Sequence, residues 1–330
     1  GVRSQESGVR RRPEGFAGLL FRNTTRPMAS TRNRFAVFLA LVLCASAAVR
    51  AAGLDLVDAV ERNDPEAVVA LLSDGADVNA TQPDGATALH WAAHWDAVDS
   101  ARRLLEAGGA VNAVNDLGVA PLAIACRNGS ARMVDTLLAG GADARTAEPS
   151  GETALMTCAR TGSAQAVEQL LSGGAVPNAS ERASGQTALM WAVAGRHTAA
   201  ARALVEAGAD LDVRSHGQFT PLLFAARAGA LEAARLLVEA GADVNAVTTD
   251  GHSPILVAAA SLDAITGSDY RLVVGSSEHE ALGIFLLDHD ADVTQADQFG
   301  MTPLHYTVEM RKPALLEALL AHGADPNAQL

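Results

Sequence analysis

The sequence predicts an all-α solenoid of stacked helix-turn-helix pairs, in which each pair contacts only its neighbours. A variant of the motif Thr-Pro-Leu-His recurs seven times, and each copy leads to a turn like that at Gly241–Asp243. The copies begin at Thr87, Ala120, Thr153, Thr187, Thr220, Ser253 and Thr302. The spacings between these anchor residues are 33, 33, 34, 33, 33 and 49 residues, and the last equals one ordinary spacing plus a 16-residue insertion. Aromatic residues make up only 4% of the chain, so the core must come from small side chains on closely packed helices.

The fullest copy of the anchor motif is Thr302-Pro303-Leu304-His305, and the fullest copy of the turn is Gly241-Ala242-Asp243-Val244-Asn245-Ala246. In period and motif the chain resembles the ankyrin repeat family, and in its Trp-Ala-Ala and Met-Thr-Cys-Ala variants it is similar to exported bacterial members. The resemblance implies helix pairs joined by β-hairpin-like loops, with hydrogen bonds from motif histidines such as His90 and His305. It also implies a non-catalytic scaffold that binds proteins, without naming the partner.

The N-terminal segment differs in composition from the rest. We interpret residues 1–27 as an over-extended or disordered segment and residues 28–52 as a secretory signal peptide. Arginines after Met28 precede the apolar run Phe35–Leu43, and small residues follow it. This predicts a periplasmic or secreted protein, with organellar import as the alternative.

Removal of residues 1–52 leaves 16 basic and 36 acidic residues, a net charge of −20. Such an acidic surface disfavours nucleic acids and anionic lipids, which are bound through Lys and Arg. The apolar run falls short of the roughly 20 residues that a membrane-spanning helix needs, so we expect no membrane span after cleavage. We expect a monomer.

Residues 53–330 are predicted to form one repeat domain. It comprises an N-terminal capping repeat over 54–80, seven further repeats, and an insertion at about 262–280 between the two helices of the sixth repeat. In the capping repeat, Asp64 and Pro65 predict the start of a helix, since Asp caps free N–H groups and Pro fits the first turn.

The fifth repeat shows how a unit is built. Thr220 and Pro221 predict the start of the inner helix, Gly229 its end, and Gly241 the end of the outer helix. A hairpin turn follows at Asp250-Gly251. Left-handed glycines are expected at the ends of the outer helices, with Asp290 replacing glycine in the sixth repeat. These glycines are Gly75, Gly109, Gly141, Gly174, Gly208, Gly241 and Gly323.

In ankyrin repeats, the exposed end of the inner helix, seven and eight residues after each anchor, is available for binding. The partner-binding candidates here are His94, Trp95, Arg127, Asn128, Arg160, Arg227 and Glu309. Trp and Arg are favoured interface residues, so this ridge suits a protein partner with acidic and apolar features. The alternative is that the arginines pair with acids of the solenoid itself.

Other chemistry receives little support. His90 and His94 are four residues apart on a helix, but they lack the Glu of a zinc protease and a third ligand. Cys126 and Cys158 lie at small-residue positions, so we interpret them as buried apolar groups rather than a disulfide. The aromatic residues four after the anchors are assigned to core packing; they are Trp91, Trp191, Phe224 and Tyr306.

We therefore predict no catalytic residues, no cofactor and no metal. The first alternative function is a structural or stabilising subunit of an envelope complex, and the second is a metal-dependent or hydrolytic enzyme.

Overall fold

The computed structural model describes residues 55–260 and 277–329. All of these belong to the unit Ala47–Leu330. The predicted N-terminal segment and signal peptide lie outside the described residues, as does most of the predicted insertion. The last part of that insertion, residues 277–280, is helical in the structure, so the outer helix of the sixth repeat begins earlier than expected.

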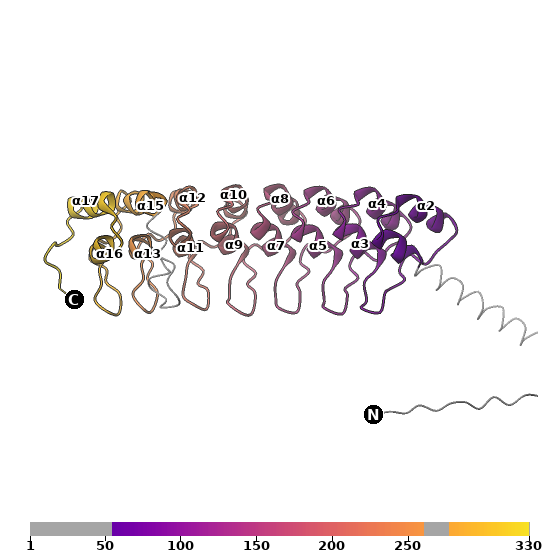
Figure 1. Ribbon diagram of the computed structural model, residues 1–330, viewed down its shortest axis with the longest axis horizontal. Coiled ribbons are helices and arrows are strands. Elements are labelled where there is room, and N and C mark those ends of the chain that lie inside the picture. Colours follow the sequence, from indigo (N-terminus) through magenta and orange to yellow (C-terminus); the bar gives the residue numbers. More distant parts are fainter. Residues whose placement is uncertain (1–54, 261–276, 330) are drawn as a thin grey trace, which may run out of the picture. The chain divides into compact units, whose positions relative to one another are not determined.

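The described residues form two rows of helices with one hairpin-like loop hanging from each repeat (Figure 1). The inner helices are α3 (Ala88–His94), α5 (Pro121–Arg127), α7 (Ala154–Thr161), α9 (Ala188–Ala194), α11 (Pro221–Ala228), α13 (Pro254–Ala260) and α16 (Pro303–Glu309). The outer helices are α2 (Pro65–Ser73), α4 (Val98–Glu106), α6 (Ala131–Ala139), α8 (Ala164–Ser172), α10 (Thr198–Glu206), α12 (Leu231–Glu239), α15 (Ser277–Leu287) and α17 (Pro313–Ala321). Residues 55–61 form the inner helix of the capping repeat.

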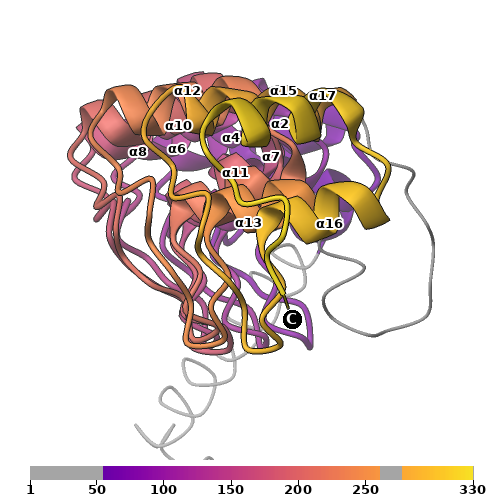
Figure 2. The same cartoon turned by 90° about the vertical axis from the view of Figure 1, so that its left-hand side faces the viewer.

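Each helix packs against the helix of its own repeat and against its counterparts on either side. In the end-on view the loops of successive repeats all project to the same side of the helices (Figure 2). Within the described residues, β pairing is limited to isolated bridges, as between Thr81 and Thr87. The predicted all-α solenoid is confirmed. Its core is a continuous apolar cluster rich in Ala and Leu, as the low aromatic content required.

Local signals for helix starts behave as predicted. The side chain of Asp64 accepts a hydrogen bond from the N–H of Ala67, and Pro65 opens α2. Thr220 likewise accepts from the N–H of Leu223 at the start of α11. These caps satisfy N–H groups that have no partner inside the helix.

The helix ends required one correction. Asp290 is left-handed with φ of 64°, as predicted for a residue in the position of a glycine. In the repeat anchored at Thr87, however, the left-handed residue is Gly108, with φ of 88°, and not Gly109. The two adjacent glycines look alike in the sequence, and only the 33-residue spacing from Gly75 distinguishes them.

The single 34-residue spacing is absorbed in the hairpin loop before Thr187. The buried carboxylate of Glu181 accepts hydrogen bonds from the backbone N–H groups of Ala183, Ser184 and Gln186, at 2.6 to 3.1 Å, and one from the Ser184 hydroxyl. Burial alone would raise the pKa of Glu181, but these hydrogen bonds outweigh it and hold the pKa at about 2. The longer loop is therefore organised by an ionised glutamate.

Candidate functional site

The predicted binding residues lie at the carboxyl ends of inner helices. We call this set of residues the inner-helix ridge. The ridge consists of His94 and Trp95 at the end of α3, Arg127 and Asn128 at the end of α5, Arg160 on α7, Arg227 on α11 and Glu309 on α16. Because the repeats stack in register, residues at equivalent positions follow one another along the row of inner helices (Figure 1).

Two ridge residues that lie eight positions after their anchors, Trp95 and Asn128, connect neighbouring repeats. The Trp95 Nε1–H donates to the backbone carbonyl of Glu61 at 2.8 Å. Asn128 donates from Nδ2 to the carbonyls of Ala93 and His94, both at 2.9 Å. These carbonyls lie at helix ends, where they lack partners within their own helix. Trp95 and Asn128 therefore cap helix ends as well as contributing to the surface. The sequence did not predict this capping role.

Thr161 extends this pattern to a third consecutive repeat. It also lies eight positions after an anchor, and its hydroxyl donates to the carbonyl of Cys126 in the preceding repeat at 3.1 Å. A side chain with a hydrogen-bond donor recurring at this position was the sequence signal for such a role.

The arginines seven positions after an anchor are exposed and held in place. Arg127 forms an ion pair with Glu148, and Arg160 pairs with Glu152 at 3.1 Å. The Arg160 guanidinium also lies 4.9 Å from the ring centre of Trp191, within the range of a cation–π contact. The proposed pairing of these arginines with acids of the solenoid is therefore present. Exposed ion pairs of this kind contribute about 0–1 kcal/mol to stability. The pairing therefore does little to stabilise the fold.

Arg227 and Glu309 lie farther along the ridge. The Arg227 guanidinium lies 4.7 Å from the ring centre of Phe224, which is buried. Glu309 is exposed at the end of α16. Its charge adds to the larger effects of burial and of the hydrogen bond from Tyr306 Oη to Asp297, which raise the pKa of Tyr306.

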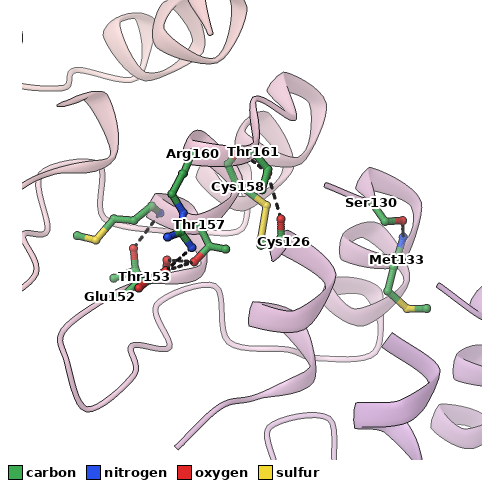
Figure 3. The surroundings of a disulfide bond; sticks show 10 residues. Cys126, Ser130, Met133, Glu152, Thr153, Thr157, Cys158, Arg160 and Thr161 are labelled. Carbon is green, nitrogen blue, oxygen red and sulfur yellow. Dashed lines mark hydrogen bonds and ion pairs between the residues drawn. A yellow bond between two sulfur atoms is a disulfide. The ribbon is translucent and has the colours of Figure 1, made fainter. Parts of the chain in front are cut away.

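Cys126 and Cys158 are buried, as predicted, but they form a disulfide. Figure 3 shows it bridging the inner helices α5 and α7, directly beside Thr161 and Arg160. The interpretation of these cysteines as separate apolar groups was wrong. Stacking brings two residues 32 positions apart in sequence to a Cα–Cα distance of 4.6 Å, which a search for closely spaced cysteine motifs does not detect.

His90 has a structural role. Its Nδ1 accepts from the backbone N–H of Thr87 at 3.1 Å, so its Nε2 donates to the carbonyl of Val119 in the next repeat at 3.0 Å. Burial lowers the pKa of His90. His305 makes the same contacts with Thr302 and Ala328, which confirms the role that the resemblance implied for both histidines. No group of three or more potential metal ligands occurs among the described residues.

The aromatic row is only partly core. Phe224 and Tyr306 are buried, whereas Trp91 and Trp191 are half-buried. Trp91 donates from Nε1 to the side chain of Gln82 at 2.9 Å. Trp191 leaves one ring face for Arg160, so this residue belongs to the ridge as well as to the packing beneath it.

Lys312 is a buried cation that sequence reasoning missed. Its side chain is 0% exposed, and Nζ donates to the carbonyl of Ala258 at 2.7 Å. Burial lowers the pKa of Lys312 to about 8, against a smaller opposing effect of Glu280. Lys312 is ten positions after its anchor, and His197 at the equivalent position also donates to a carbonyl of the preceding repeat, that of Arg160.

Within the described residues, no helix is long and apolar enough to cross a membrane.

Family models of ankyrin repeats match most of the chain. A model of ankyrin repeats in three copies matches residues 56–148 and 130–215. A model of ankyrin repeats in many copies matches residues 204–258, and a single ankyrin repeat matches residues 299–329. Ankyrin repeats are generally modules for protein–protein interaction and are typically non-catalytic. Together with the stacked helix pairs and the histidine contacts, these matches establish that the chain belongs to the ankyrin repeat family.

Proposed function

We propose that this protein is an exported, non-catalytic scaffold that binds a protein partner through the inner-helix ridge. The observation that carries the proposal is the presence of exposed arginines at one repeat position, each anchored by a neighbour. Arg127 and Arg160 are anchored by glutamates and Arg227 by an aromatic ring. Anchored Arg side chains lose less conformational freedom on binding, so they are suited to an interface.

Two independent features support export. Arginines after Met28 are followed by the apolar run Phe35–Leu43 and by small residues, a pattern typical of a signal peptide. The disulfide between Cys126 and Cys158 is the second feature, because disulfides persist in oxidising compartments and are rare in the cytosol. A periplasmic or secreted location fits both.

The test is capture of partners from the native host by the processed protein, followed by mass spectrometry. The ridge variant carries Arg127→Gln, Arg160→Gln and Arg227→Gln. The matched control carries the same charge change on outer helices, at Arg102, Arg132 and Arg202, which are exposed on α4, α6 and α10.

We expect the ridge variant to lose partners that both the parent and the control retain, with unchanged helical circular dichroism in all three proteins. If the folded ridge variant captures the same partners as the control, the ridge is not the interface. Partners lost only by the outer-helix control would instead support a role for the opposite face, as in a subunit packed into an envelope complex.

A further inference from the structure

We propose that Arg127 and Arg160 form a two-pronged clamp for an acidic segment of the partner, with two carboxylates three residues apart in a polyproline II conformation. The inference rests on the proposed function and specifies the chemistry that this part of the ridge recognises. Both arginines come from adjacent repeats, on α5 and α7.

The clamp presents its positive groups outward and keeps its negative groups inward. The side chain of Arg127 is 41% exposed, whereas that of its partner Glu148 is 16% exposed. For Arg160 and Glu152 the values are 53% and 18%. An approaching group therefore meets guanidinium before it meets carboxylate, although each pair is neutral as a whole.

Each guanidinium retains hydrogen-bonding capacity. Arg127 uses Nη2 for Glu148, and Arg160 uses Nη2 for Glu152. The structure assigns no further hydrogen bond to either guanidinium among the described residues. Because the group carries five N–H donors, Nε and Nη1 of each arginine remain for a second carboxylate, in the paired geometry that arginine favours.

The spacing of the two arginines is fixed by the elements beneath them. The Cys126–Cys158 disulfide joins α5 to α7, and the Thr161 hydroxyl donates to the Cys126 carbonyl across the same contact (Figure 3). Arg160 is additionally held over the ring of Trp191. A clamp that is rigid before binding loses little entropy when the ligand arrives.

The repeat spacing sets the ligand pattern. Packed helices lie about 8–10 Å apart. A polyproline II chain has three residues per turn and rises about 3.1 Å per residue, so acids three residues apart lie on one face, about 9 Å apart, and match adjacent repeats. The net charge of −20 over residues 53–330 repels a polyacidic chain at long range. The segment that fits therefore carries two acids in an otherwise uncharged stretch.

The experiment measures binding of labelled peptides to the processed, oxidised protein by fluorescence anisotropy. The probe has the central sequence Glu-Pro-Pro-Glu, whose prolines favour the polyproline II conformation. The comparison peptides have Gln-Pro-Pro-Gln, which removes the charges, and Glu-Glu-Pro-Pro, which changes the spacing.

We expect the probe to bind more tightly than both comparison peptides. Arg127→Gln and Arg160→Gln should each weaken it about tenfold, as expected for losing a hydrogen bond to a charged group, while Arg132→Gln on α6 should have no effect. Glu148→Gln should strengthen binding, because it keeps a hydrogen-bond acceptor for Arg127 and removes the competing charge. This last result would not follow if the arginines acted only in folding.

Equal binding of the Glu and Gln peptides, absence of binding, or equal effects of Arg127→Gln and Arg132→Gln would each overturn the clamp. These outcomes are separable from failure of the proposed function. If the ridge variant loses its cellular partners while the acidic peptide fails to bind, the ridge is the interface and its partner has different chemistry.

Discussion

Removing the disulfide between Cys126 and Cys158 should destabilise the repeat domain without changing its fold. The perturbation is the double substitution Cys126→Ala and Cys158→Ala. Alanine fits both sites, because neighbouring repeats have a buried alanine there. The position of Cys126 is occupied by Ala159 in the next repeat, and the position of Cys158 by Ala125 in the preceding repeat. The substitution therefore removes the covalent link while keeping the packing close to that of neighbouring repeats.

The magnitude follows from the length of chain that the link closes. A cross-link over 32 residues lowers the entropy of the unfolded chain by an amount worth about 3.7 kcal/mol at 25 °C. With an unfolding entropy of about 2.1 cal/mol/K per residue over residues 53–330, that corresponds to a fall in Tm of roughly 6 °C. Urea unfolding followed by circular dichroism measures the difference between the oxidised parent and the double variant.

Reductant supplies the control. Unfolding in a dithiol reductant should lower the stability of the parent towards that of the double variant, and should leave the double variant unchanged. Equal stability of the oxidised parent and the double variant would refute the reasoning. Detection of two free thiols in unfolded, unreduced protein of the processed chain would show that the link does not form.

Three further predictions concern single residues and processing. Asp290→Gly should raise the free energy of unfolding by about 0.5–1 kcal/mol in urea, because relief of the strained left-handed backbone outweighs the greater entropy that glycine gives the unfolded chain. The reciprocal Gly241→Asp should lower it. A loss of stability in Asp290→Gly would contradict this reasoning. Lys312 has a folded-state pKa of about 8 against an ordinary 10.5, so the unfolded chain binds more protons between these values and stability should rise by up to about 3 kcal/mol as pH increases from 8. Lys312→Met should abolish that rise in urea titrations at pH 8 to 10, and an identical pH dependence in both proteins would argue against a buried charge. Intact-mass measurement of protein from the native host should find a chain that begins between Ala45 and Leu54, whereas recovery of only unprocessed chain would contradict export.

The sequence by itself determined the repeat register and most local structure. Repetition at 33 residues gave the order of the helices, and Thr220 and Pro221 marked a helix start because capping depends on neighbours in sequence. The roles of His90 and His305 were also predictable, since the same motif places the same contacts in each repeat that contains it. The left-handed Asp290 followed from the same register.

Only the tertiary structure decided which groups meet between repeats. Cys126 and Cys158 are one helical position apart in their repeats, yet stacking brings them into a disulfide. Trp95 was assigned to the surface from its position, but its indole N–H reaches a free carbonyl at the end of the preceding helix. The partners of Arg127 and Arg160 were likewise undetermined, because the acids that reach them come from hairpin loops whose side-chain directions depend on packing. Contacts within a repeat follow the local sequence, whereas contacts between repeats depend on how the repeats stack.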